Sequence, residues 1–326
     1  MMSDLPTLAS ADLDPALAGF LAQAAAQGNP PLEALPPPVA RQMYRDLARA
    51  LGLPPPEIGR VFHTAIAGPG GDLPLRVYTP SSAVQQLSLP IVLYVHGGGF
   101  VIGDLESHDS VCRTLCHHAE MLVVAVDYRL APEHPFPAAP DDVEATLRWL
   151  LAYAGSLGAD PQRIAVVGDS AGAQLALVAA RRVQANAVRA LGLIYPVAQH
   201  PDKPSPSYQE NGEGKFLTMG AMRWFIASYL GGQSPGHPDM ALLQSDLAGL
   251  PATWLATMGH DPLRDEGHAL ALRAKAAGVA VTHQHYPGAI HACIHFSAVS
   301  PVGTQLLVDM AQWLRLQIEG ENYNIE

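Results

Sequence analysis

Positive charge is scarce in this sequence of 326 residues. It contains 19 lysine and arginine residues against 30 aspartate and glutamate residues, and its formal net charge is −11. Because the basic residues form no cluster that could neutralise phosphates, the composition argues against a surface for nucleic acid or for an anionic membrane. Hydrophobic residues make up 48% of the chain and charged residues 15%, which predicts an ordinary globular protein with a large buried core.

Cysteine and long apolar runs are lacking as well. The three cysteines, Cys112, Cys116 and Cys293, are too few for a disulfide framework and suit a reducing cytoplasm. No stretch is long and apolar enough to span a bilayer, and the acidic start of the chain has neither the basic nor the apolar region of a signal peptide. We therefore expect a cytoplasmic protein that does not insert into membranes.

What the sequence does contain is a repeated alternation of strand and helix patterns. Apolar runs predict buried strands at residues 91–95, 122–126, 164–167, 190–195, 253–258 and 279–286, and helical spacing predicts helices at 107–120, 141–154, 174–184, 265–277 and 303–316. Residues 61–67 and 75–78 predict an antiparallel hairpin at a sheet edge. This alternation is typical of an α/β protein with a mostly parallel, doubly wound sheet.

Two segments interrupt the alternation. The first precedes the hairpin and contains two predicted helices, 16–27 and 39–51, which prolines separate and end. The second is polar and rich in proline and glycine at 200–214, and it then predicts a helix at 218–229 with Thr218 as its N-cap. The first segment is either an extension packed on the core or a lid over a pocket, and the second is another candidate lid.

The turn between the predicted strand at 164–167 and the next helix reads Gly168-Asp169-Ser170-Ala171-Gly172. When a strand turns this tightly into a helix, only glycines fit around the serine, and the serine hydroxyl is exposed at the carboxyl end of the strand. This arrangement is called a nucleophile elbow, and it predicts that Ser170 is a nucleophile. The alternative is that Ser170 only caps the following helix.

A serine nucleophile needs a base that takes its proton and a carboxylate that orients the base. Asp261 follows the predicted strand at 253–258, and His291 follows the strand at 279–286 after a loop. Because the carboxyl ends of parallel strands meet at one edge of the sheet, we expect both side chains beside Ser170. The chain order of serine, acid and histidine is that of hydrolases with a nucleophile elbow.

Other residues compete for these roles. Asp265 and Glu266 have a simpler interpretation as acidic residues in the first turn of a helix, where the helix dipole favours them. Three further histidines are expected on one face of a strand or packed beyond the loop: His283, His285 and His295.

Cysteines raise a second set of alternatives. Cys112 and Cys116, followed by His117 and His118, could suggest a metal site, but two small apolar residues on the buried face of a helix explain their spacing better. Cys293, two positions after the proposed base, is interpreted as a packed small residue and not as a reactant.

The predicted strand at 91–95 ends in the motif HGGGF at 96–100. Glycines have no side chains to keep the backbone away from a reacting group, so the N–H groups of this run can reach the negative oxygen that forms during acyl transfer. Ala171, directly after Ser170, can add a further N–H from the start of its helix. The expected role of His96 is to hold the glycine loop by a hydrogen bond.

Five blocks follow one another along the chain: HGGGF at 96–100, DYRLAPEHPFPAAPDD at 127–142, GDSAG at 168–172, DPLRDEG at 261–267 and GAIH at 288–291. Together they resemble the hormone-sensitive-lipase-like family of α/β-hydrolases, the bacterial family IV esterases, from about residue 60 to 295. The resemblance implies an α/β-hydrolase fold with a mostly parallel eight-stranded sheet flanked by helices. It also implies a helical cap built from residues 1–56 and 197–236 on a core built from 57–196 and 237–326.

The same resemblance assigns roles to individual residues. It implies Ser170 as the nucleophile, Asp261 as the acid and His291 as the base. The implied oxyanion hole consists of the backbone N–H groups of Gly98, Gly99 and Ala171. The residues expected to support this site are His96, Gly97, Asp127, Glu133 and Asp169.

The chain departs from the family pattern at two places. After the elbow the family usually has Gly and Asn, and here Ala173 and Gln174 occupy these positions. After the histidine a Gly-Phe pair is common, and here Ala292 and Cys293 follow. Neither change removes a catalytic atom, but both can reshape the pocket.

The predicted function is hydrolysis of short- to medium-chain carboxylic esters through an acyl-enzyme, as the resemblance implies. An amidase or lactonase, such as an arylformamidase, would use the same triad, and a small-molecule receptor could keep the pocket without catalysis. The mechanism needs neither a metal nor an organic cofactor. The expected partner is a small ester, and the resemblance suggests a homodimer paired along residues 279–286.

Overall fold

The computed structural model describes residues 8–9, 11–85, 88–183 and 186–319. Within them one sheet of eight strands has the order β1-β2-β4-β3-β5-β6-β7-β8. The strands are β1 (Arg60–Gly68), β2 (Gly71–Thr79), β3 (Leu89–Val95), β4 (Leu122–Val126), β5 (Ala159–Asp169), β6 (Ala190–Ile194), β7 (Ala252–His260) and β8 (Val281–Ile290). β1 and β2 form an antiparallel hairpin at one edge, and the strands from β4 to β8 pair in parallel. The predicted hairpin and the mostly parallel sheet are confirmed.

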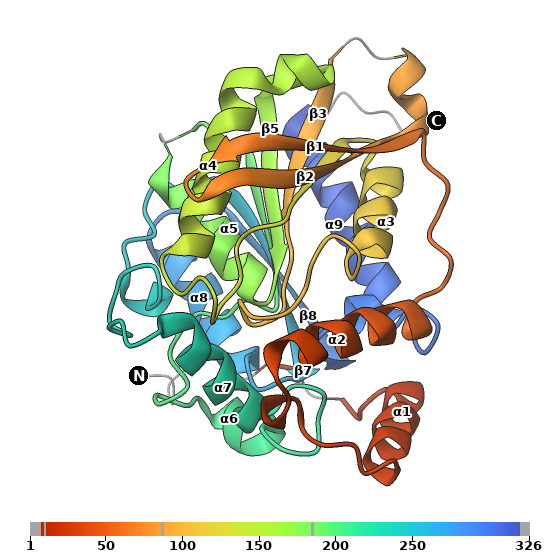
Figure 1. Cartoon of the computed structure of the whole chain (residues 1–326), viewed down its shortest axis with the longest axis vertical. Coiled ribbons are helices and arrows are strands. Elements are labelled where there is room, and N and C mark those ends of the chain that lie inside the picture. Colours follow the sequence, from red (N-terminus) through yellow and green to blue (C-terminus); the bar gives the residue numbers. More distant parts are fainter. Residues whose placement is uncertain (1–7, 10, 86–87, 184–185, 320–326) are drawn as a thin grey trace.

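Helices cover both faces of the sheet. Helices α3 (Asp109–Ala119) and α9 (Val302–Glu319) contact each other on one face, and α4 (Ala138–Tyr153), α5 (Ala171–Arg182) and α8 (Arg264–Ala276) lie on the other (Figure 1). Each face packs its own apolar core against its helices. The central strands are therefore buried on both sides, which is why they read as unbroken apolar runs in the sequence.

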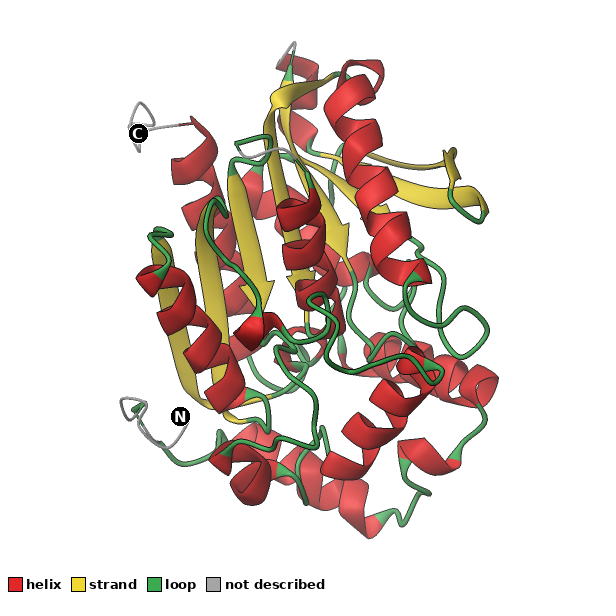
Figure 2. Cartoon of the chain, turned by 90° about the vertical axis from the view of Figure 1, so that its left-hand side faces the viewer, coloured by secondary structure: helices red, strands yellow, loops and turns green. Residues whose placement is uncertain are grey.

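Four further helices lie beyond the carboxyl ends of the strands. They are α1 (Pro15–Ala26), α2 (Pro37–Leu51), α6 (Pro206–Asn211) and α7 (Met219–Leu230). Figure 2 shows the strand arrows pointing towards this layer, so segments far apart in the sequence cover one end of the sheet. Thr218 caps α7, and its hydroxyl accepts a hydrogen bond of 3.0 Å from Ala221 N. We call these helices the cap, and the division at residues 56, 196 and 236 stays a prediction.

Strands β2 and β5 begin four and five residues earlier than the sequence predicts, at Gly71 and Ala159. Two further elements also differ from the sequence-based expectation. Residues 200–214 were expected to be irregular, but they contain helix α6. The sequence gives no sign of this helix, because six residues are too few to show a helical period. Strand β8 continues through Pro287 and Gly288 to Ile290, so His291 follows the strand directly and not after a loop. The proline and glycine indicated a strand end, but an edge strand tolerates both.

Some predicted segments extend past the described residues. Residues 1–7 and 10 of the first cap segment, residues 86–87 and 184–185 of the first core segment, and residues 320–326 of the last core segment lie outside them. Residue 184 is also the last residue of the predicted helix at 174–184. No helix in the described part of the chain combines the length and the hydropathy that crossing a membrane requires.

Candidate active site

Ser170 stands in the turn between β5 and α5 with φ 55° and ψ −120°, a strained conformation for a residue with a side chain. A Cβ atom at Gly168 would collide with the carbonyl of Gly172, and one at Gly172 would collide with the carbonyl of Val95. The two glycines of the motif are therefore required by the tight turn. The Ser170 side chain makes no capping hydrogen bond to its helix, which argues against the capping interpretation.

The structure brings the three predicted polar residues into one hydrogen-bonded chain. His291 Nε2 lies 3.0 Å from Ser170 Oγ, and His291 Nδ1 lies 2.7 Å from Asp261 Oδ2. The second oxygen of Asp261 accepts a hydrogen bond of 2.9 Å from Leu263 N, which fixes the carboxylate. The side chains are buried, with 7% of Ser170, 5% of His291 and 0% of Asp261 exposed. Such a chain can carry a proton from the hydroxyl to the imidazole.

The competing acids are engaged elsewhere. Asp265 Oδ2 accepts from Ser207 N at 2.8 Å, and Glu266 Oε1 accepts from Ala198 N at 2.8 Å. Both carboxylates therefore fix the chain around α6 and the segment after β6. Neither makes a hydrogen bond to the His291 ring within the described residues.

The competing histidines also have other partners. His283 Nε2 and His285 Nδ1 each lie 2.9 Å from Thr257 Oγ1. His295 Nε2 lies 2.9 Å from the hydroxyl of Tyr44. These contacts place the three rings outside the hydrogen-bonded chain that ends at Ser170.

The glycine run at 97–99, which we call the oxyanion loop, lies beside Ser170 in the same cavity. Gly98 and Gly99 have φ values of +116° and +58°, a region that favours glycine. Within the described residues, the N–H groups of Gly98, Gly99 and Ala171 make no hydrogen bond. They are consequently available as donors to a negatively charged oxygen above Ser170.

His96 holds the oxyanion loop from the sheet side. Its Nδ1 lies 2.8 Å from Gly97 O, and its ring stacks on Tyr128 with ring centroids 4.2 Å apart. Burial, followed by the neighbouring His108, lowers the pKa of His96 to about 4. The ring is therefore neutral near pH 7 and serves as a support.

Two of the predicted acidic supports, Asp127 and Glu133, make no hydrogen bond to the oxyanion loop within the described residues. Burial, followed by the charge of Asp104, raises the pKa of Asp127 to about 6. No hydrogen bond joins the Asp127 carboxylate to the oxyanion loop in the part of the chain that the structure describes. Glu133 binds the guanidinium of Arg41 in the cap, with Oε1 2.9 Å from one of its nitrogens.

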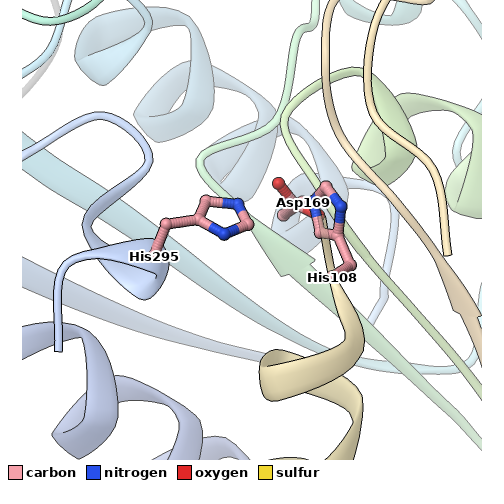
Figure 3. Close-up of side chains that lie close together, drawn as sticks. All are labelled: His108, Asp169 and His295. Atoms are coloured by element: carbon pink, nitrogen blue, oxygen red, sulfur yellow. The ribbon is translucent and has the colours of Figure 1, made fainter. Parts of the chain in front are cut away.

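Three buried side chains lie with their polar atoms within 4.8 Å of one another: His108, His295 and Asp169, the residue that precedes Ser170 (Figure 3). Two imidazoles and a carboxylate are donors that transition metals accept, but Asp169 and His295 already have hydrogen-bond partners in the protein. Asp169 Oδ1 accepts from Gly97 N at 2.9 Å and from the Tyr94 hydroxyl at 2.8 Å. We therefore assign the cluster to hydrogen bonding.

The charge of Asp169 is stabilised within this cluster. Burial alone would raise the pKa of the Asp169 carboxyl, but the neighbouring His108 and His295 and the hydrogen bond from Tyr94 together outweigh burial and hold the pKa below its usual value. His108 Nε2 lies 3.4 Å from Asp169 Oδ1. A buried carboxylate thus stands directly before the candidate nucleophile and binds the oxyanion loop.

A cavity of about 790 Å³ opens over Ser170 and the oxyanion loop, within the range of small-molecule sites. Both parts of the cap form its largely apolar wall. The apolar side chains that line it include Phe20, Leu21, Leu47, Leu217, Met222 and Phe225.

Of the four departures from the family pattern, Ala292 lines the cavity, and the other three are buried. Ala173 is fully buried, and Gln174 Nε2 donates to Asp239 O at 2.6 Å. Cys293 is buried with its sulfur 3.8 Å from that of Met258. Cys112 and Cys116 are free and packed in the core, so all three cysteines are structural residues here.

Sequence reasoning did not find the supports Tyr44 and His108 or the cap residue Arg41. Tyr44 and its partner His295 are 251 positions apart, and each lies in a segment whose local pattern predicts only a helix or a loop. No signal in a single sequence indicates such a pair.

Comparison with known proteins relates these features to a family. A model of the α/β-hydrolase fold family matches residues 92–295. Carboxylesterase NlhH of Mycobacterium tuberculosis is 38% identical over 318 residues, which cover 92% of this chain and 94% of that protein. The ethyl acetate hydrolase of Pseudomonas putida is 37% identical over 252 residues, which cover 76% of this chain and 79% of that protein.

A solved structure agrees with these relatives. An ester hydrolase from the metagenome of Lake Arreo, in complex with a derivative of bipyridine phosphonate, has a TM-score of 0.88 and 36% identity, covering 93% of this chain and 98% of that one. The family model and these matches extend over most of the sequence. The chain therefore belongs to the α/β-hydrolase fold family, with esterases as its relatives.

Proposed function

We propose that this protein is a carboxylic ester hydrolase that works through an acyl-enzyme on Ser170. The observation that carries the proposal is the buried series of hydrogen bonds from Ser170 through His291 to Asp261. It ends in a cavity beside unused backbone N–H donors. Nucleophile, base, orienting acid and oxyanion donors are the parts that acyl transfer requires.

The reaction follows from the geometry. Ser170 Oγ attacks the ester carbonyl carbon while its proton moves to His291 Nε2, and Asp261 stabilises the resulting imidazolium. The carbonyl oxygen becomes negative and accepts hydrogen bonds from the oxyanion loop and from Ala171 N. His291 then gives its proton to the leaving alcohol. A water molecule activated by His291 finally releases the acid and restores Ser170.

The proposed substrates are esters with short to medium acyl chains. The cavity size and its apolar wall support this range, as does a relative named ethyl acetate hydrolase. The five ordered sequence blocks support a finer placement in the hormone-sensitive-lipase-like family. We also propose a cytoplasmic location, because all three cysteines are free, and cell fractionation that recovered the chain outside the cytoplasm would contradict it.

The test compares the native chain with Ser170→Ala on p-nitrophenyl acetate through decanoate. We expect kcat to fall by a factor on the order of 10⁴ or more in Ser170→Ala, because the triad acts as a unit. Ser156→Ala, which changes an exposed serine bonded to Tyr153 O, is the matched control and retains full activity. Equal turnover by the Ser170→Ala variant contradicts the mechanism.

A parallel panel of lactones and formamides separates related activities. The account predicts that kcat/KM is highest for the simple esters. A preference for lactones or formamides would move the assignment to a lactonase or an amidase on the same residues, and binding without turnover of any of them would indicate a receptor.

A further inference from the structure

Two arginines on helix α2 of the cap form hydrogen bonds with the segment that follows the oxyanion loop. Arg41 Nε donates to Val101 O at 2.8 Å, and another of its nitrogens donates to Ala131 O at 3.0 Å. One turn later, Arg45 binds Asp104 at 2.7 Å. Charge-assisted hydrogen bonds of this kind are stronger than neutral ones, so the cap helix is tied to the backbone just beyond the glycines.

Glu133 fixes the guanidinium of Arg41 for this purpose. Both oxygens of Glu133 accept hydrogen bonds from Arg41, at 2.9 Å and 2.6 Å. An ion pair this close to the surface contributes little by itself. Its effect is to orient the planar guanidinium so that the remaining N–H groups point at two main-chain carbonyls.

The same helix also reaches the loop from inside the protein. The hydroxyl of Tyr44, one of the residues that line the cavity, lies 2.9 Å from His295 Nε2, and both side chains are buried. Burial, followed by the neighbouring charge of His108, lowers the pKa of His295 to about 3. The His295 ring is therefore neutral near pH 7, and its bond to Tyr44 is between two neutral groups.

A buried path continues from His295 to the first glycine of the loop. The rings of His295 and His108 meet edge to face with centroids 4.6 Å apart, and His108 faces the Asp169 carboxylate (Figure 3). Asp169 in turn accepts the N–H of Gly97 at 2.9 Å. Contacts from α2 thus reach the oxyanion loop at both of its ends, through Tyr44 at the start and through Arg41 just past the end.

We propose that helix α2 positions the oxyanion loop, and that Arg41 and Tyr44 are its positioning residues. The inference rests on the proposed ester hydrolysis. A run of glycines has little intrinsic stiffness, yet its N–H groups must point at the place where negative charge develops. Contacts with a rigid helix supply that order, so the cap contributes to the rate as well as to the shape of the cavity.

The experiment measures kcat and KM for p-nitrophenyl butyrate, and the inhibition constant of an alkyl trifluoromethyl ketone. The ketone forms a hemiketal whose oxygen occupies the oxyanion hole, so it reports on the loop directly. In Arg41→Met we expect kcat to fall about tenfold and the inhibition constant to rise by a similar factor. KM should stay within about twofold, because the loop donates mainly to the transition state.

Variants on the same helix complete the test. Arg49→Met removes an exposed arginine whose ion-pair partner is Asp46 on the same helix, and it should leave all three quantities unchanged. Arg41→Lys, which keeps the charge and one set of donors, should recover part of the loss. Tyr44→Phe removes one hydroxyl and keeps the wall of the cavity, so it tests the inner path even if Arg41→Met fails to fold.

The outcomes separate this inference from the proposed function. If the unaltered chain hydrolyses no ester, the proposed function fails. If it does hydrolyse esters, and the folded Arg41→Met and Tyr44→Phe variants both match it in kcat and in ketone inhibition, the role of α2 is overturned. A rise in KM with kcat and ketone inhibition intact also overturns it, because α2 would then act only on substrate binding.

Discussion

The strain at Ser170 is local, and the surrounding backbone supports it. A residue with φ near 55° and ψ near −120° costs about 1–3 kcal/mol. Ser170 N nevertheless donates to Ile194 O at 2.8 Å, and Ser170 O accepts from Ala173 N at 3.1 Å. These bonds to β6 and α5 hold the hydroxyl at the end of its strand, where it meets His291.

Residue roles that depend on one local pattern could be predicted from the sequence. Ser170, Asp261 and His291 each follow a strand, and the fold brings strand ends together, so their meeting needed only the strand pattern. The links from Tyr44 to His295 and from Arg41 to Val101 join segments that no pattern relates. They depend on how the cap packs against the core, and neither the helix and strand propensities nor the hydrophobic periodicity of the sequence contains that information.

Glu266 gives a prediction for the dependence of stability on pH. Burial, partly offset by the hydrogen bond from Ala198 N, raises its pKa to about 8, and the charge of Asp261 adds to the rise. Between its usual pKa of 4.5 and about 8, the folded chain holds a proton that the unfolded chain has lost. The free energy of unfolding therefore falls as pH rises through this window.

Glu266→Gln should lack this fall, because an amide does not titrate and its oxygen can still accept from Ala198 N. Urea unfolding at about pH 5, 7 and 9 measures the difference. We expect the variant to gain stability relative to the native chain as pH rises. If the free energy of unfolding changed with pH in the same way for the two proteins, Glu266 would already be ionised in the folded chain.

At the scale of elements, the oxyanion loop is packed between the sheet and the cap. A Cβ atom at Gly99 would collide with the ring of Phe225 on α7, and the φ of +58° at Gly99 is unfavourable for other residues. The loop and α7 can approach this closely only because the position is glycine.

Gly99→Ala should therefore lower kcat by a factor on the order of 10², since the donor of residue 99 would move. Gly155→Ala is the matched control, because a Cβ there meets nothing within 4 Å. Steady-state kinetics on p-nitrophenyl butyrate checks both variants. Native kcat in Gly99→Ala would show that this N–H is not part of the oxyanion hole.

The elements themselves show which signals are read correctly from sequence. Long apolar runs and helices with a clear period were found within a few residues of their observed bounds. Helix α6 and the end of β8 were missed for opposite reasons. The first is too short to show a period, and the second passes through a Pro-Gly pair whose usual meaning is a turn. Tertiary contacts stabilise both elements. In α6, Ser207 N donates to Asp265, and the end of β8 pairs with β7.

At the scale of the whole molecule, the apolar runs of the sequence predict the buried strands of the sheet. The two segments that interrupt the alternation of strands and helices correspond to the cap. Strand β8 closes the sheet at one edge. Near its carboxyl end Asp14 N donates to Gly288 O at 3.0 Å, so the chain before α1 lies against this end of the strand.

Pairing of two copies along β8 remains a prediction. Exposed edge strands can pair with another chain, and we expect a homodimer whose population grows with protein concentration. Sedimentation velocity over a hundredfold range of concentration tests it. A single monomeric species throughout would remove the dimer from the account.

The central claim is that Ser170 carries the acyl group during ester hydrolysis. The most direct measurement mixes the native chain with p-nitrophenyl acetate, quenches with acid during the initial burst, and locates added mass by peptide mass spectrometry. The account predicts one acetyl group per chain, on the peptide that contains Ser170, and none in Ser170→Ala. An acetyl group on another residue, or rapid hydrolysis with no acylated peptide, would contradict it.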